Sequence, residues 1–267
     1  MKTKDSQVAE SKKKEGYRVY KLNGVEGQVV ARKGGPTKSQ IAKSSSYHSL
    51  RQNQKEFGVA SMMAKMLRKS LPPVLSGICE SYVSGKLTAT FRKLAQKEKG
   101  KTGTRPLLLS KHGRLLKGFE FNSSYPFKKI FRAKFLLKQG SSRGHFIFHF
   151  PSYVPEKQLI FPQGSTHYKL VGHLIAISDF ECSAQEKGYL AKAPEFNGKF
   201  TTLNSPMRLI CRFPLEPATE QLSLSNGKDF STEAGLLLIM GVHFYRYEKN
   251  KYHDLKVGNS MQIYEVF

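Results

Sequence analysis

Residues 49–71 read SLRQNQKEFGVASMMAKMLRKSL, and this stretch decides how the N-terminal half of the chain folds. Its apolar residues recur at alternating steps of three and four, which is the spacing of one face of an α-helix. The pair Pro72-Pro73 ends the helix because proline cannot continue it. We therefore expect one helix with two faces. The core face comprises Leu50, Asn53, Phe57, Ala60, Ala64, Leu67 and Leu71, and the basic face comprises Arg51, Lys55, Lys65 and Lys69.

Three further segments complete this half. The pair Asn23-Gly24 accepts positive φ at both positions and lies between two apolar runs, which predicts a β-hairpin over 17–33. An apolar stripe at helical spacing predicts a second helix over 74–97. The short turn between the two helices favours antiparallel packing. The lysine-rich stretch 98–105 is expected to be a loop.

From Leu107 onward the apolar period changes to two, which is typical of β-strands. Clusters of Pro, Gly, Asn and Ser separate the expected strands at fairly regular spacing, and this pattern favours an antiparallel β-sandwich. We therefore expect an α+β chain in three parts. These are a disordered basic arm over 1–15, a basic hairpin and two-helix module over 16–138, and a β-sandwich domain over 139–267.

The positive charge is concentrated in one half of the sequence. Residues 1–138 hold 31 Lys and Arg against 8 Asp and Glu, whereas residues 139–267 hold 13 against 12. An excess of this size costs stability through self-repulsion unless a polyanion compensates it. We therefore expect a non-catalytic binding protein whose basic half contacts a polyanion, most simply nucleic-acid phosphates without sequence readout.

The expected contacts lie on the hairpin, the two helices and the loop after them. They are Arg32, Lys33, Arg51, Lys55, Lys65, Lys69, Arg92, Lys93, Lys97, Lys99, Lys101 and Arg105. A solvated face that serves solubility explains the same charges equally well. The alternative function is a structural or assembly protein that uses both domains for association with itself or with a protein partner.

No string in the sequence carries a catalytic or metal-binding signature. Residues 95–102 match a relaxed phosphate-loop pattern, but such a loop follows a buried strand and opens a helix, and this stretch follows a helix. His145 and His149 share one face of a strand, as do His167 and His173, at spacings that are not diagnostic of a metal site. We expect no enzyme activity, no cofactor and no metal.

The cellular setting follows from the cysteines and the apolar runs. The three cysteines are widely spaced, the N-terminus lacks the apolar core of a signal peptide, and no apolar run reaches the roughly 18 residues that cross a bilayer. These features predict a cytoplasmic protein with reduced thiols and no membrane contact.

Six strings resemble an uncharacterised family of bacterial proteins with no assigned activity. They are residues 31–35 (ARKGG), 51–53 (RQN), 56–58 (EFG), 65–68 (KMLR), 118–122 (GFEFN) and 164–168 (GSTHY). The resemblance extends over most of the chain and is strongest from Val30 to Asn122. It implies a bacterial source and no catalytic residues. It also suggests that Gly58 admits a close backbone approach, and that Glu120 pairs with an arginine while the phenylalanines beside it are buried.

Overall fold

The computed structural model describes residues 16–21, 26–32, 34–183, 185, 188–224 and 230–267. The chain divides into two compact units, 1–51 and 52–267, whereas the charge pattern of the sequence changes near residue 139. The expected arm over 1–15 and the Asn23-Gly24 turn lie outside the described residues.

The first unit begins with the predicted hairpin. Strands β1 (Tyr17–Tyr20) and β2 (Val29–Arg32) pair antiparallel. Helix α2 (Lys38–Lys43) and the short helix η1 (Ser45–Tyr47) follow. Thr37 caps α2, because its hydroxyl accepts the Gln40 N–H while the Gln40 side chain accepts the Thr37 N–H. A capped helix thus leads into the long helix predicted from the sequence.

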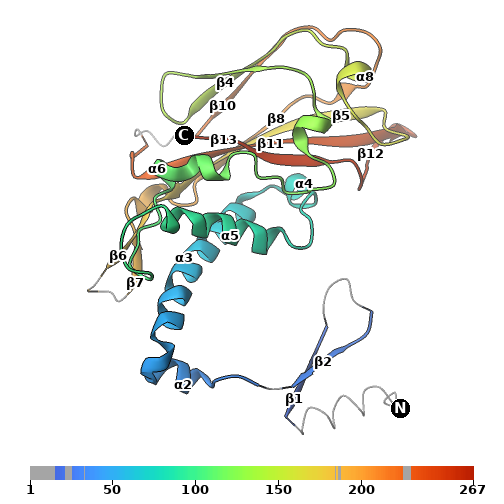
Figure 1. Cartoon of the computed structure of the whole chain (residues 1–267). Coiled ribbons are helices and arrows are strands. Elements are labelled where there is room, and N and C mark those ends of the chain that lie inside the picture. The colour runs from blue at the N-terminus through green and yellow to red at the C-terminus, as the bar shows by residue number, and fades with distance from the viewer. Residues whose placement is uncertain (1–15, 22–25, 33, 184, 186–187, 225–229) are drawn as a thin grey trace. The chain divides into compact units, whose positions relative to one another are not determined.

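A six-stranded antiparallel sheet forms the centre of the second unit (Figure 1). Four strands follow the order β12-β11-β5-β8, while β13 pairs with β11 and β9 pairs with β5. These strands are β5 (His167–Ser178), β8 (Phe200–Asn204), β9 (Arg208–Leu209), β11 (Ala234–Glu248), β12 (Lys251–Asp254) and β13 (Ser260–Val266). A three-stranded sheet, ordered β10-β4-β3, contains β3 (Leu136–Gln139), β4 (His145–Phe150) and β10 (Ala218–Ser223). A separate hairpin pairs β6 (Phe180–Ser183) with β7 (Gly188–Ala191).

Both faces of the central sheet are buried. Alternate residues of β5 join two different apolar clusters, as the two-residue period of a strand requires. Val171, Ile175 and Ile177 pack with the helices. Leu170, Leu174 and Ala176 pack with Phe146, Phe148 and Phe150 of β4. The helices therefore cover one face of this sheet and the three-stranded sheet covers the other (Figure 1).

The α+β class is confirmed by these helices and antiparallel strands, but the β-sandwich is not. A sandwich of two sheets leaves outward-facing positions polar, whereas β5 is buried at every position from Leu170 onward and β11 at every position up to Phe244. Near-continuous apolar strands of this kind indicate a sheet that is covered on both sides.

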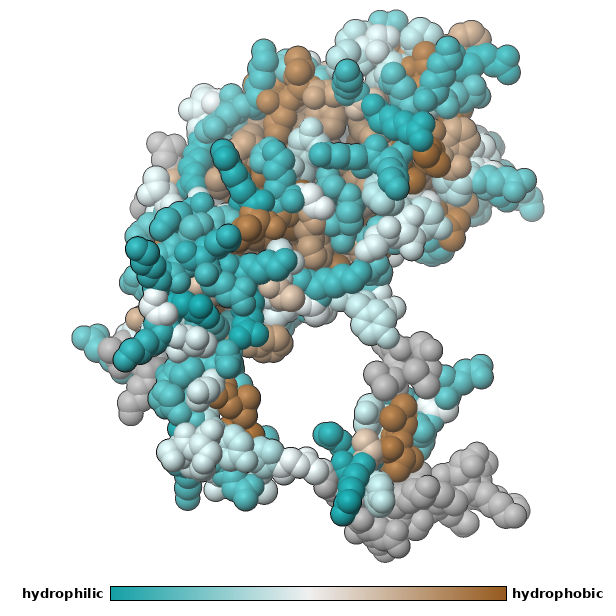
Figure 2. All heavy atoms as spheres, in the orientation of Figure 1, coloured by the Kyte–Doolittle hydropathy of each residue, from teal (hydrophilic) through white to brown (hydrophobic). Residues whose placement is uncertain are grey.

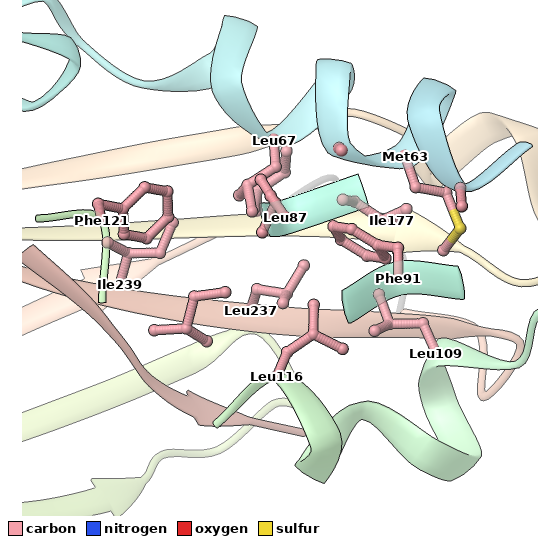
Figure 3. Packing of buried hydrophobic residues seen from close by; sticks show 14 of the residues in the cluster. Met63, Leu67, Leu87, Phe91, Leu109, Leu116, Phe121, Ile177, Leu237 and Ile239 are labelled. Atoms are coloured by element: carbon pink, nitrogen blue, oxygen red, sulfur yellow. The ribbon is translucent and has the colours of Figure 1, made fainter. Parts of the chain in front are cut away.

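The helical layer contains α3 (His48–Ser70), α4 (Pro73–Ser76) and α5 (Val83–Gln96), so the single helix expected over 74–97 is in fact two. Figure 3 shows Met63 and Leu67 of α3 and Phe91 of α5 packing together against strand residues. The expected core face of α3 needs three corrections. Leu50 is 39% and Phe57 is 52% exposed, whereas Glu56 beside Phe57 is fully buried.

Short helices connect these layers. They are α6 (Leu109–His112), η2 (Gly113–Leu116), α7 (Phe127–Ile130), α8 (Pro155–Gln158) and η3 (Pro194–Phe196). In the described part of the chain, no helix is both long enough and apolar enough to span a bilayer.

Candidate polyanion interface

The structure separates the predicted contacts into exposed lysines and internally bonded arginines. Seven lysines are exposed, and none of them has an ion-pair partner among the described residues: Lys55, Lys65, Lys69, Lys93, Lys97, Lys99 and Lys101. Arg51, Arg92 and Arg105 are half-buried. Arg32 is exposed on β2, and Lys33 lies outside the described residues.

A buried carboxylate holds the loop that follows α5. The Glu56 side chain is fully buried, and it accepts hydrogen bonds from Arg105 Nε at 2.8 Å and Arg105 Nη2 at 2.7 Å. The Gly103 amide donates a third hydrogen bond, at 2.8 Å. Burial raises the pKa of the Glu56 carboxyl, but the bonds from Arg105 and Gly103 and the charges of Arg105 and Arg92 outweigh it, so the net pKa lies below the ordinary value.

We call residues 97–105 the lysine loop, because it carries Lys97, Lys99 and Lys101. Its far end is fixed from two sides. Gly103, at a φ of +88°, passes so close to α3 that an added Cβ would lie 2.0 Å from Gln52 Oε1. The Tyr189 hydroxyl of β7 donates to the Arg105 carbonyl at 2.8 Å. The loop is therefore held between α3 and the β6-β7 hairpin.

The other two arginines connect helices in the same way. Arg92 Nη2 donates to Asn53 Oδ1 at 2.8 Å and so joins α5 to α3. Arg51 Nη1 donates to the carbonyls of Ile41 and Ser44, at 2.5 and 2.7 Å, and so fixes the end of α2. Planar guanidinium groups with several donors suit such bridging roles.

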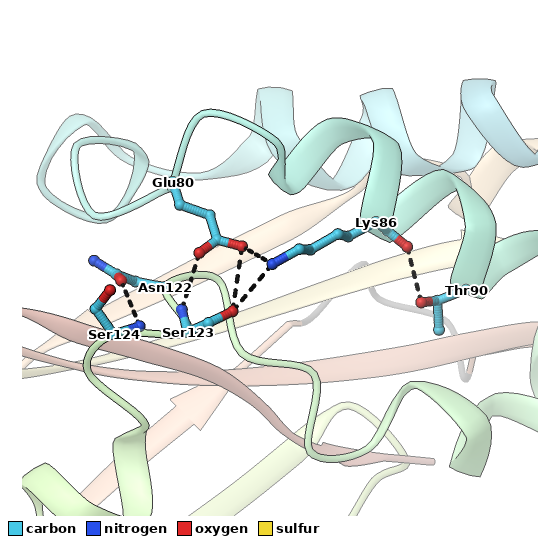
Figure 4. Close-up of polar contacts among 6 residues, drawn as sticks. All are labelled: Glu80, Lys86, Thr90, Asn122, Ser123 and Ser124. Atoms are coloured by element: carbon cyan, nitrogen blue, oxygen red, sulfur yellow. Dashed lines mark hydrogen bonds and ion pairs between the residues drawn. The ribbon is translucent and has the colours of Figure 1, made fainter. Parts of the chain in front are cut away.

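Only three acidic residues occur between residues 27 and 119, and all three are paired internally. Glu56 pairs with Arg105. Glu98 accepts from Lys111 at 2.8 Å and contacts His112 at 2.6 Å. Glu80 contacts Lys86 and accepts the Ser123 amide at 3.1 Å (Figure 4).

Hydrogen bonds from Lys86 and Lys111 lower the pKa values of Glu80 and Glu98, respectively. All three carboxylates are therefore charged at neutral pH, and each is paired with a basic residue other than the seven exposed lysines. The positive charges of those seven lysines are therefore not neutralised by these carboxylates.

The exposed lysines follow the helices. Lys93 and Lys97 lie four residues apart, which places them on one face at the C-terminal end of α5. Lys55 lies on α3 between Asn53, which bonds to Arg92 of α5, and Glu56, which bonds to Arg105 of the lysine loop. Lys65 lies roughly 15 Å further along α3 at 1.5 Å per residue. In Figure 2, hydrophilic side chains cover most of the region over α5 and the adjoining part of α3.

His173 takes a structural position. The Ser70 hydroxyl donates to the Leu67 carbonyl at 2.8 Å, so it accepts from His173 Nε2 at 2.9 Å, and the Thr202 hydroxyl lies 2.8 Å from His173 Nδ1. Burial lowers the pKa of His173 to about 4. Both ring nitrogens are engaged and the ring is neutral at pH 7. Among the described residues, no group of three or more His, Cys, Asp or Glu is arranged to hold a metal ion.

The family strings also receive structural roles. Phe119 and Phe121 pack edge to face at 5.3 Å, and Phe121 is fully buried. Glu120 was expected to pair with an arginine. It instead accepts the Phe127 amide at 3.1 Å and contacts Gln262. Gly58 has no atom within 4 Å of an added Cβ, so the expected close backbone approach is wrong.

No family model, curated protein or solved structure matches this chain.

Proposed function

We propose that this chain is a non-catalytic cytoplasmic protein that binds nucleic-acid phosphates through the lysines of α3, α5 and the lysine loop. One observation carries the proposal. The only three carboxylates between residues 27 and 119 are paired internally, while the seven exposed lysines have no acidic partner among the described residues. Uncompensated charge of one sign attracts a polyanion.

The two kinds of basic residue would divide the work. Lysine carries a compact charge on a flexible stem, which suits phosphate contact without base recognition. Arg92 and Arg105 act as positioning residues, because they hold α5 and the lysine loop against α3. Affinity would then fall with salt and depend little on base sequence.

A charge-matched pair of variants tests the proposal. The first replaces Lys93, Lys97, Lys99 and Lys101 by glutamine. The second replaces four exposed basic residues elsewhere, Lys134, Lys138, Lys157 and Arg212, by glutamine. Electrophoretic mobility shifts with duplex and single-stranded 20-mers would give the affinities in 100 mM salt.

We expect the first variant to bind more than about tenfold more weakly than the natural chain, because four phosphate contacts are lost. The second should bind within about threefold of the natural chain. Equal losses in both variants would mean that net charge alone attracts the nucleic acid. No binding by the natural chain at low salt would end the proposal.

A second candidate function is assembly through protein contacts. It is favoured by two apolar side chains on the solvent side of α3, Phe57 at 52% and Met62 at 40% exposure. Light scattering after nuclease treatment distinguishes the two functions. A discrete oligomer that Phe57→Ser and Met62→Ser convert to a monomer would support assembly.

A further inference from the structure

Three aromatic rings form an exposed cluster at the end of the central sheet. Tyr247 of β11 lies directly opposite Tyr252 of β12, with ring centroids 4.8 Å apart. His167 of β5 contacts both rings, at 5.7 Å from Tyr247 and 5.1 Å from Tyr252. We call these three residues the aromatic shelf. None of the roles described above uses it.

The shelf lies on the face of the sheet that the helices cover elsewhere. Leu75 of α4 packs against Gly241 of β11, and Tyr245 and Tyr247 follow at alternate positions of the same strand. The helices do not cover this end, since Tyr247 is 44% and Tyr252 is 49% exposed. Leu209 of β9, paired with His167, is 50% exposed and adds an apolar border.

The charge around the shelf is positive. The segment 245–257 contains four Lys and Arg and two acidic residues. Arg246 and Lys251 alternate with Tyr247 and Tyr252 and so lie on the other face of the strands, whereas Lys249 lies in the turn that joins the two tyrosines. On the shelf face, Lys169 of β5 lies two residues from His167, and Asp254 is paired with Lys256. An exposed aromatic platform with basic neighbours favours an anionic ligand that has flat rings. Single-stranded nucleic acid has both properties, because every base offers a π-face and every linkage a phosphate.

We propose that the aromatic shelf stacks unpaired bases, so that the nucleic acid bound by this protein is single-stranded. This inference rests on the proposed function and adds to it the class of ligand. A duplex keeps its bases stacked on one another, so it would reach the lysines but gain nothing from the shelf. Stacking tolerates every base, in keeping with binding that does not read sequence.

The shelf and the lysine loop lie at opposite ends of the central sheet: β12 is at one end and the β6-β7 hairpin, which holds the loop, is at the other (Figure 1). Helix α3 and β5 connect the two ends through the contact between Ser70 and His173. From Glu56 to Ser70 the helix rises about 21 Å. From His173 to His167 the strand spans about 20 Å. A single strand that uses both sites must therefore be long.

The absence of tryptophan from this chain permits a direct test. Tyr252→Trp keeps a ring on the shelf and introduces the only tryptophan. Leu136→Trp places the reporter on β3 of the three-stranded sheet, at a position that is 61% exposed, and serves as the control. Each variant is titrated with a 20-nucleotide single strand, the matching duplex, a four-nucleotide single strand and a neutral oligosaccharide.

We expect the 20-nucleotide single strand to quench the fluorescence of the Tyr252→Trp variant strongly and that of the Leu136→Trp variant little, and the duplex to quench neither. In mobility shifts, Tyr247→Ala combined with Tyr252→Ala should weaken binding of that strand about tenfold, from the loss of stacking, and leave the duplex within about twofold. The four-nucleotide strand should bind at least tenfold more weakly than the 20-nucleotide strand, because it reaches one site only.

Two results would overturn the inference. Equal quenching by single strand and duplex, or no quenching of the Tyr252→Trp variant while the strand is bound, would show that the shelf does not stack bases. Quenching by the oligosaccharide alone would assign the shelf to a sugar ligand. In these cases the glutamine variants of the lysines can still weaken nucleic-acid binding. The proposed function is therefore tested independently of the shelf.

Discussion

Replacing Arg105 by methionine should destabilise the second unit by about 3–5 kcal/mol, because the Glu56 carboxylate then stays buried without its counter-charge. The structure sets this magnitude. Glu56 is fully buried and accepts three hydrogen bonds, two of which come from Arg105. Methionine preserves much of the side-chain volume and removes both bonds. Among the described residues that donate to the carboxylate, the Gly103 amide then remains, and it carries no full charge.

The reverse change should cost less. Glu56→Gln leaves Arg105 without its partner, but the Arg105 side chain is 17% exposed and can reach water. We expect a loss of about 1.5–3 kcal/mol, the usual contribution of hydrogen bonds to a charged group. The double variant should cost less than the sum of the two single variants by at least about 1 kcal/mol, because the unpaired buried charge is absent.

Urea unfolding at pH 7, followed by circular dichroism, measures these free energies without adding salt. Hydrogen exchange at the Gly103 amide reports whether the lysine loop loosens as well. A loss below about 1 kcal/mol for Arg105→Met, or additivity of the two substitutions, would refute this reasoning. Either result would mean that the pair does not hold the loop.

Three further predictions concern the glycines of α3 and the lysine loop, the Glu80–Lys86 pair and the buried His173. Gly103→Ala should destabilise the protein by more than about 1 kcal/mol, because alanine is strained at positive φ and its Cβ would clash with Gln52. Gly58→Ala, in open space within α3, should stabilise the protein by about 0.5–1 kcal/mol. The urea midpoints of the two variants check both predictions. Glu80→Gln should cost less than about 1 kcal/mol, because the Lys86 side chain in this pair is 50% exposed; a larger loss in urea would contradict the contrast with Glu56. The pKa of His173 is about 4 in the folded chain and about 6.5 in the unfolded chain. Between these pH values only the unfolded chain binds the extra proton, so the free energy of unfolding should fall as the pH drops from 6.5 to 4. This residue should contribute about 3 kcal/mol to the fall. His173→Gln should make that decline shallower in urea unfolding measured at pH 7, 5.5 and 4.5, and an unchanged slope would count against a buried neutral ring.

The sequence predicted the long helix well, because one amphipathic period runs through most of 49–71. It failed at Glu56 and Phe57, where periodicity places an aromatic ring inside and a charge at the edge. The charge is inside because Arg105 and Gly103 neutralise and hydrogen-bond it, and these partners lie more than 40 residues away. A helical pattern contains no information about such distant partners.

The change to a two-residue period after Leu107 correctly indicated strands, but the layer of helices that covers the central sheet was not predicted. The apolar runs of β5 and β11 are the signal that was available, because a strand with both faces buried loses its alternation. The helices of the basic half supply the second cover, and they lie in the sequence before every strand of the sheet they cover.

The helical pattern predicted that the lysines are exposed, but it did not predict that the arginines form internal hydrogen bonds. Arg51, Arg92 and Arg105 look the same in sequence as the lysines beside them, yet each is bound to an internal acceptor. The aromatic shelf was also missed. Tyr247 and Tyr252 become neighbours only through the turn at Lys249 and Asn250, both of which adopt positive φ. Asn250 in that turn is the sequence signal that could have indicated the hairpin.

The salt dependence of nucleic-acid binding tests the central claim most directly. A plot of log affinity against log salt between 50 and 200 mM has a slope that counts the phosphates neutralised, about 0.9 per contact on a duplex. If Lys93, Lys97, Lys99 and Lys101 each contact a phosphate, replacing all four by glutamine should make the slope about 3 to 4 shallower. An unchanged slope, with the natural chain still binding, would show that these lysines do not meet the phosphates.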